Sequence, residues 1–160
     1  MVRIKNRWIL FELIENPVFE NGEVVFPRTT LGLTEEDIGR AIAAAINADF
    51  GDYGLGMAKS LNVKWYNPMT RVGIARIPRE YTDMVLATLF FMNKIGKQTC
   101  SFRILHVSGT IIKVQNQAII RDRDIYLEER AKAEKRGQSY TVQDKIEKSA
   151  REIKQIQAFS

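Results

Sequence analysis

The sequence is poor in residues that many enzymes and metal proteins depend on. Among 160 residues there is one cysteine, Cys100, and one histidine, His106. A single cysteine excludes an internal disulfide and favours a reducing compartment. These two residues cannot form a metal site with the usual ligand spacing, and a nucleophile–base pair would need a third residue to orient the histidine. We therefore predict no metal site and no catalytic residue, and we interpret His106 as a core residue.

Long apolar runs are also missing. No stretch approaches the roughly 20 apolar residues of a membrane span, and the charged, alternating N-terminus is unlike a signal peptide. No membrane partner is expected, and the length suits one domain with a short appendage. The glycine-rich residues 51–60 (GDYGLGMAKS) fail as a phosphate-binding loop, because they follow a predicted helix and because Met57 and Ala58 separate the last glycine from the lysine.

The charge that is present is unevenly distributed. The formal net charge is +5, with a pI of 9.4, which favours an acidic partner. Residues 17–56 hold two basic and seven acidic residues, a net charge of −5. Residues 57–123 hold eleven basic and three acidic residues, a net charge of +8. This distribution predicts that one face of the molecule meets phosphate while another does not.

Apolar periodicity predicts an alternation of strands and helices. Strands are expected at residues 4–14, 61–66, 71–77 and 101–107, and helices at residues 34–50, 79–95 and from 110 onward. Thr34, three residues before Asp37, is expected to cap the first helix, which Gly51 should end. The resulting order βαββαβ predicts an α+β fold, a ferredoxin-like or RRM-like sandwich with additional C-terminal helices.

Two segments lie outside this pattern. Asn21-Gly22, between short β-favouring runs, predicts an inserted loop or hairpin at about residues 17–33. Residues 126–160 form a charged helical extension with only a thin apolar stripe. We interpret this extension as a solvated helix or a partner-binding arm, not a second core. The expected division is an RRM-like domain at residues 1–125 followed by the extension.

The predicted second helix carries more apolar surface than one sheet face requires. One stripe suffices for packing on a sheet, yet Leu86, Leu89 and Phe90 begin a second. Either the C-terminal helix of the chain covers this second stripe, or another protein does. We predict a partner interface at these three residues.

A strand–turn–helix junction is the first candidate for nucleic-acid contact. Residues 104–113 (ILHVSGTIIK) end a strand, turn at Ser-Gly-Thr and open a helix that carries Lys113. Such a junction suits a phosphate, or it merely connects two elements. Ser108 or Thr110 is expected to cap the helix.

Base stacking on the sheet is not expected, because the third strand, RVGIARI, lacks the aromatic residues that RNA-stacking sheets use. Any RNA would then be bound by basic side chains and backbone groups. The candidates are Arg3, Lys5, Arg7, Arg71, Arg76, Lys113, Arg121 and Arg123, with Lys64 as an additional one.

Four stretches, taken in order, resemble the Pop-five family of small protein subunits of ribonuclease P and ribonuclease MRP. They are MVRIKNRWILFE (1–12), DFGDYG (49–54), TRVGIARIPRE (70–80) and HVSGTIIKVQNQAI (106–119). The first stretch and the VSGTI turn are the specific ones. The resemblance covers residues 1–125 and excludes the insertion and the extension. It implies an RRM-like fold, catalysis by the RNA with bound magnesium ions, and pairing with a TIM-barrel-like protein subunit.

These observations together predict a non-catalytic subunit of ribonuclease P, and of ribonuclease MRP, in the nucleus (nucleolus). It would support removal of the 5′ leader from precursor tRNA and processing of rRNA, and would bind no cofactor itself. The alternative is a ferredoxin-like regulatory domain that binds a small ligand as a homodimer, which would not need the +8 stretch. A small enzyme would require a pocket that holds Asp49 and Asp52.

Overall fold

The computed structural model describes residues 5–27 and 32–156, and their elements confirm the predicted α+β fold. They are β1 (Asn6–Glu15), β2 (Val18–Glu20), β3 (Glu23–Val25), α1 (Glu35–Ala58), β4 (Asn62–Asn67), β5 (Val72–Pro78), the 3-10 turn η1 (Arg79–Tyr81), α2 (Thr82–Phe91), β6 (Lys94–Ile95), β7 (Gln98–Ser108), α3 (Ile111–Lys135) and α4 (Gln143–Lys154).

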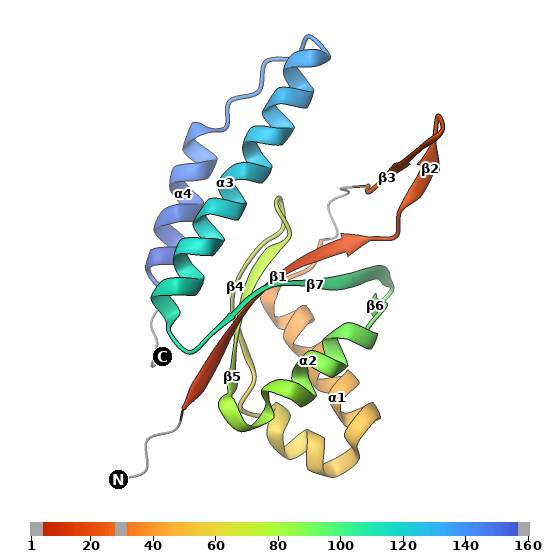
Figure 1. Ribbon diagram of the computed structural model, residues 1–160, viewed down its shortest axis with the longest axis vertical. Coiled ribbons are helices and arrows are strands. Elements are labelled where there is room, and N and C mark those ends of the chain that lie inside the picture. Colours follow the sequence, from red (N-terminus) through yellow and green to blue (C-terminus); the bar gives the residue numbers. More distant parts are fainter. Residues whose placement is uncertain (1–4, 28–31, 157–160) are drawn as a thin grey trace.

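An antiparallel sheet with the strand order β4-β5-β1-β7-β6 forms the centre of the molecule. Without the short edge strand β6, this is the order expected of a ferredoxin-like βαββαβ unit. Helices α1 and α2 cover one face of the sheet, and α3 and α4 lie against the other (Figure 1). The sheet is therefore covered on both faces.

Strand β1 shows why the sequence needs two covering layers. Ile9, Phe11 and Leu13 are buried in the core under α1 and α2, whereas Trp8 and Leu10 are buried in a second core under α3 and α4. Side chains alternate between the faces of a strand, so apolar residues of both parities mark a strand buried on both sides. Each such side chain contributes about 1.5–3 kcal/mol on burial.

Helix α1 begins as the sequence predicts. Thr34 Oγ1 accepts a hydrogen bond from the Asp37 amide at 3.2 Å, and Asp37 Oδ2 accepts one from the Thr34 amide at 3.0 Å. This reciprocal pair forms a capping box. The hydrogen bonds that Asp37 Oδ2 accepts from the Thr34 amide and from the Thr34 hydroxyl lower the pKa of Asp37. The helix does not end near Phe50; it kinks at Gly51 (φ 64°, ψ −151°), and helical structure resumes as far as Ala58.

Helix α2 is shorter than predicted. It ends at Phe91 instead of continuing to Ile95, because residues 94–95 pair as β6 with the start of β7. Ile95 is buried in the core from this strand. Gly96 adopts φ 59° in the turn between β6 and β7.

The C-terminal extension is part of the core, which corrects the sequence interpretation. Helix α3 continues through the predicted boundary at 125/126, and α4 packs against α3 and β4. Ile125 of α3 and Ile153 of α4 are fully buried with Trp8 and Trp65 in the second core. A thin stripe on each helix suffices, because the two stripes and the sheet bury one another.

A buried polar cluster fixes this helical pair to the turn between β4 and β5. Asn67 Nδ2 donates to Asp122 Oδ1 at 3.0 Å, to the Tyr126 hydroxyl at 3.0 Å and to Ser149 Oγ at 3.1 Å. The Thr70 hydroxyl also donates to Asp122 Oδ1. Desolvation raises the pKa of Asp122, against the opposing effect of these hydrogen bonds.

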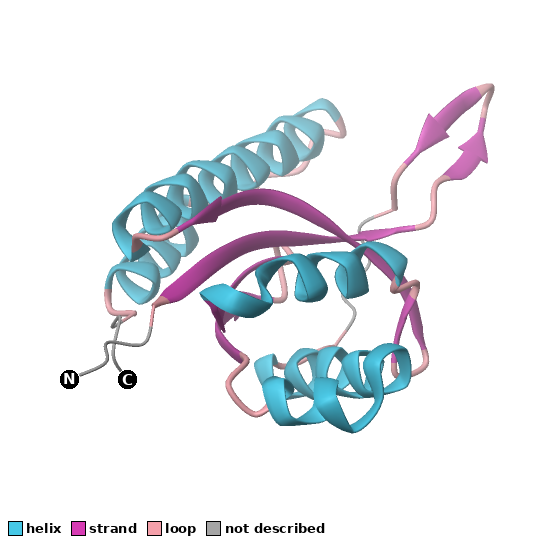
Figure 2. Ribbon diagram, turned by 60° about the horizontal axis from the view of Figure 1, so that its bottom comes forward, coloured by secondary structure: helices cyan, strands magenta, loops and turns pink. Residues whose placement is uncertain are grey.

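The predicted insertion forms the hairpin β2–β3. Asn21 (φ 51°) and Gly22 (φ 84°) occupy its turn, as a type I′ turn requires. Figure 2 shows the hairpin projecting beyond the sheet and away from all four helices. Predicted residues 28–31 of the insertion lie outside the described residues.

Candidate functional site

The sheet face that RRM proteins use for RNA is covered in this molecule. Trp8, Trp65 and Ile74 lie on that face and are buried in the second core, beneath α3 and α4. Bases therefore cannot stack on the sheet in this arrangement, and contacts with nucleic acid must come from its rim and from the outer helical surface. This agrees with the expectation drawn from the third strand.

Several predicted basic residues lie near one end of the sheet. There β1 begins, β5 ends and β7 leads into α3, because Trp8 pairs with Arg76 on one side and with Ser108 on the other. Lys5 precedes β1, and its carbonyl accepts a hydrogen bond from the Arg79 amide at 2.9 Å. We call Lys5, Arg7, Arg76 and Lys113 the basic rim.

The junction between β7 and α3 lies within this rim. Ser108 Oγ accepts a hydrogen bond from the Thr110 amide at 3.2 Å. Thr110 is the N-cap residue, but in the described structure its side chain makes no cap hydrogen bond, which corrects one prediction. The Arg7 guanidinium lies beside Gly109, since a Cβ atom there would be 2.8 Å from Arg7 Nη1. Lys113 is exposed in the first turn of α3.

Lys64 adjoins the rim from the edge strand β4. Asn62 pairs with Arg76, and Lys64 lies at the irregularity between Val63 and Trp65. Partial burial lowers the pKa of Lys64, and the nearby charge of Arg76 lowers it further. These two like charges lie close enough to interact.

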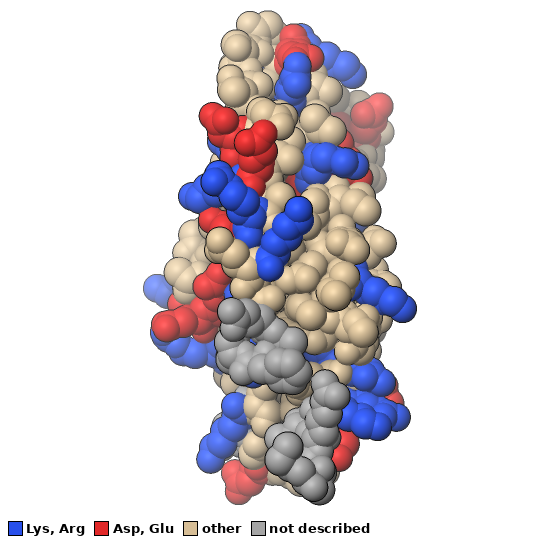
Figure 3. All heavy atoms as spheres, turned by 90° about the vertical axis from the view of Figure 1, so that its left-hand side faces the viewer, with Lys and Arg blue, Asp and Glu red and all other residues tan. Residues whose placement is uncertain are grey.

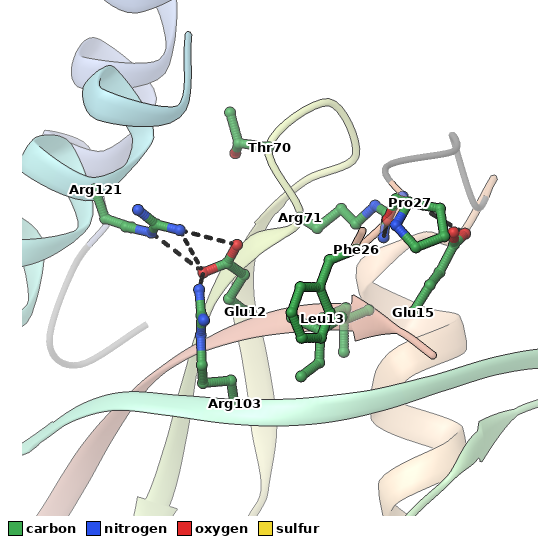
Figure 4. Close-up of a pocket in the computed structure, with 10 residues that line it drawn as sticks. Glu12, Leu13, Glu15, Phe26, Pro27, Thr70, Arg71, Arg103 and Arg121 are labelled. Atoms are coloured by element: carbon green, nitrogen blue, oxygen red, sulfur yellow. Dashed lines mark hydrogen bonds and ion pairs between the residues drawn. The ribbon is translucent and has the colours of Figure 1, made fainter. Parts of the chain in front are cut away.

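Two other predicted residues belong to a pocket of about 230 Å³ near the C-terminal end of β1. Glu12 is central to it (Figure 4). Arg103 Nη2 donates to Glu12 Oε2 at 2.6 Å, and Arg121 donates to both Glu12 oxygens at 3.2 Å. Arg71 is buried and lies 3.5 Å from Glu15 Oε1.

The pocket changes the role of these arginines. Arg71 is buried beside the Glu15 carboxylate, and its role as an RNA ligand stays a prediction. Arg121 remains partly exposed, but its guanidinium already neutralises Glu12. The sequence reasoning missed Arg103, which faces Glu12 across the β1–β7 pair. Only the strand register identifies this partnership.

The remaining basic candidates are dispersed. Arg123 is exposed on α3, with Nη2 at 3.7 Å from Asp124 Oδ1, and Arg3 lies outside the described residues. Figure 3, which views the side of the molecule formed by α3 and α4, shows basic and acidic side chains interspersed. The rim and the pocket are thus separate groups on a mixed surface.

The predicted partner interface requires a correction. Leu89 is only 1% exposed and belongs to the core, and the partly buried Leu86 packs against that core. Phe90 is 79% exposed, and its ring meets that of Phe91, also exposed, edge to face at 5.3 Å. The exposed apolar surface of α2 is therefore the Phe90–Phe91 pair, which we call the aromatic pair.

The single cysteine and the single histidine both lie on β7. Cys100 is buried, and burial raises the pKa of its thiol. His106 is half-buried on β7, not fully enclosed. The described residues hold no group of three or more His, Cys, Asp or Glu placed to bind a metal. In residues 5–27 and 32–156, no helix has the length and apolar character that crossing a bilayer requires.

The fold and these surfaces define a ferredoxin-like protein with a sheet enclosed by two helical layers and a basic rim at one end. The sequence identifies the protein family more narrowly than the fold does. The model of the Rpp14/Pop5 family matches residues 7–119. The chain belongs to this family, as the four motifs predict.

Curated relatives agree. The "Ribonuclease P/MRP protein subunit POP5" of Schizosaccharomyces pombe is 32% identical, covering 77% of this chain and 89% of that protein. The protein of the same name from Saccharomyces cerevisiae is 33% identical, covering 78% and 79%. A chain in the cryo-EM structure of yeast ribonuclease MRP has a TM-score of 0.48 and 8% identity, over 69% of this chain and 79% of that one.

Proposed function

We propose that this chain is a non-catalytic protein subunit of the ribonuclease P and ribonuclease MRP ribonucleoproteins. Membership of the Rpp14/Pop5 family carries the proposal, because similar proteins from two yeasts are named as subunits of both particles. In this role the chain supports RNA-catalysed removal of the 5′ leader from precursor tRNA, and rRNA processing. The catalytic magnesium ions belong to the RNA, and the particle acts in the nucleus and nucleolus.

The basic rim is the part of the chain that we assign to RNA. Three observations support it: the rim combines Lys5 with basic side chains from β1, β5 and α3, the N-cap residue of its helix makes no side-chain cap hydrogen bond, and the sheet face is covered by α3 and α4. Basic side chains and helix N-termini bind phosphate oxygens without reading sequence. The rim would therefore position RNA and not select a base sequence.

Salt dependence tests this assignment. Lys113→Gln and Arg7→Gln should each weaken binding of the particle RNA about equally for different sequences. Each should also reduce the slope of log K against log salt by roughly one unit. Lys132→Gln, an exposed position near the other end of α3, is the matched control and should leave the slope unchanged. If the rim variants keep the wild-type slope while folded, RNA binds elsewhere.

The aromatic pair is the surface that we assign to the TIM-barrel-like partner subunit. Aromatic side chains at the centre of an interface commonly contribute most to its affinity, and Phe90 and Phe91 are both exposed. Phe90→Ser/Phe91→Ser should reduce co-purification of that subunit at least about tenfold, a loss that about 1.4 kcal/mol produces. Leu127→Ser, an exposed apolar position on α3, is the control. Equal recovery with both variants would remove the assignment.

The homodimeric ligand-binding alternative is not supported. Family membership places the chain with ribonucleoprotein subunits. The small-enzyme alternative also gains nothing from the geometry: Asp49 borders a groove of about 370 Å³ between α1 and α2, and Asp52 is not among its lining residues.

A further inference from the structure

The β2–β3 hairpin exposes an unusual concentration of apolar side chains. These are Val18, Phe19, Val24, Val25 and Phe26, which are between 40% and 74% exposed. The hairpin extends from the end of β1 as a two-stranded sheet of its own (Figures 1 and 2). A two-stranded hairpin is at best marginally stable in water, and contiguous exposed apolar surface marks an interaction site.

The two faces of the hairpin differ in chemistry. Phe19 pairs with Val24 and Glu20 pairs with Glu23. Because side chains alternate along a strand, the first pair lies on one face, and the glutamates lie on the other, next to the turn and together with the Val18–Val25 pair. Like charges directly opposite one another destabilise a hairpin. A cation from a partner would relieve this repulsion.

We propose that this hairpin is a docking arm for another protein, whose surface combines an apolar groove with lysine or arginine side chains. The groove takes Phe19 and Val24 on one face, and its walls extend around the tip so that the cations meet Glu20 and Glu23 on the other. RNA is disfavoured as the occupant because phosphates and the two carboxylates have the same sign. A bilayer is disfavoured because the carboxylates lie nearest the tip, where insertion would begin.

The apolar face continues toward the body of the molecule. Phe26 follows β3, and it lines the 230 Å³ pocket together with Leu13, Arg103 and Arg121. The side chains of Phe26 and Leu13 lie together in that pocket (Figure 4). A partner segment that runs along the hairpin from its tip would therefore arrive at this pocket.

Photocrosslinking of the full-length chain in its assembled complex tests the proposal. A diazirine amino acid at position 19, which reacts with protein, RNA and lipid alike, should attach to one other protein, on a peptide that contains lysine or arginine. The variant Glu20→Lys/Glu23→Lys should reduce this adduct at least about tenfold. Glu134→Lys/Glu147→Lys changes the net charge equally on α3 and α4 and should leave the adduct intact.

Each other result overturns the proposal: attachment to RNA, to lipid or to a second copy of this chain, or no attachment. An adduct that survives reversal of both hairpin glutamates also contradicts it, because the charge complementarity would then be absent. The hairpin lies outside the rim, so its failure leaves the salt-slope test of RNA binding untouched. Circular dichroism of each charge variant confirms that the fold is intact.

Discussion

Replacing Glu12 by glutamine perturbs the charge balance between β1, β7 and α3. Its side chain is 4% exposed, and its carboxylate is held by Arg103 and Arg121. Glutamine keeps the shape of the side chain and one acceptor oxygen, but it removes the negative charge. The guanidinium groups of Arg103 and Arg121 would then repel each other without the negative charge of Glu12 between them. The folded state should therefore lose stability.

The magnitude follows from the exposure of the two arginines. Removing one partner of a fully buried ion pair costs about 3–5 kcal/mol, whereas exposed pairs contribute at most about 1 kcal/mol. Arg121 is 25% exposed and Arg103 is 48% exposed, so solvent screens the repulsion that remains. We expect a loss of about 2 kcal/mol, between these limits, which lowers Tm by about 4–8 °C for a domain of this size.

Urea unfolding followed by circular dichroism measures this loss. Glu128→Gln is the matched control. The Glu128 side chain is 53% exposed, and its carboxylate lies 3.9 Å from the same Arg121. Removing its charge should cost less than about 0.5 kcal/mol. The second variant Glu12→Gln/Arg121→Met should recover part of the stability. A loss below about 0.5 kcal/mol for Glu12→Gln would refute the argument that this carboxylate balances two arginines.

Two further predictions concern the core. Leu89→Asp should unfold the chain or lower the free energy of unfolding in urea by at least about 3 kcal/mol, because it buries a charge in the core. Phe90→Asp should change that free energy by less than about 0.5 kcal/mol. Equal effects of the two substitutions would contradict the assigned burial. The pKa of the Asp122 carboxyl is raised above its ordinary value of 3.8 in the folded state, so the folded state binds the Asp122 proton more tightly than the unfolded state does. The contribution of Asp122 to stability is therefore fully present below pH 3.8 and falls as the pH rises from there through the raised pKa. The stability of the wild type relative to Asp122→Asn should therefore fall over that window in urea titrations, and a constant difference would contradict the assignment.

Local features of the fold were predictable where a short stretch contains both interacting groups. Asn21-Gly22 specifies its own turn, because the two residues adopt the positive φ that a type I′ turn requires. Thr34 and Asp37 form their capping box within one helical turn. Apolar residues of both parities in β1 are likewise typical of a strand that is covered on both faces.

Predictions failed where the partner is distant in the sequence. Helix periodicity extended α2 to Ile95, but pairing with β7 places that residue in a strand. The stripe on α2 suggested that Leu89 faces a partner, whereas Leu89 packs in the chain's own core. The thin apolar stripe of α4 suggested a solvated helix. This interpretation failed because the burial of α4 depends on α3 and on Trp65 of β4, which are distant in the sequence.

The sequence alone determined the class of this protein. Its strand and helix order, its basic central stretch, its lack of a metal-ligand set and four motifs sufficed for an α+β fold and for the Rpp14/Pop5 family. These properties depend on composition and on spacing along the chain, which can be read without coordinates.

The tertiary structure decided which charged and apolar residues are available to partners. Arg71 and Arg121 are as basic in the sequence as Arg7 and Lys113, but only the fold pairs the first two with Glu15 and Glu12. Their carboxylate partners are tens of residues away, and the energy of an ion pair depends on distance and burial in space. For the same reason, only the structure distinguishes the buried Leu89 from its exposed neighbour Phe90.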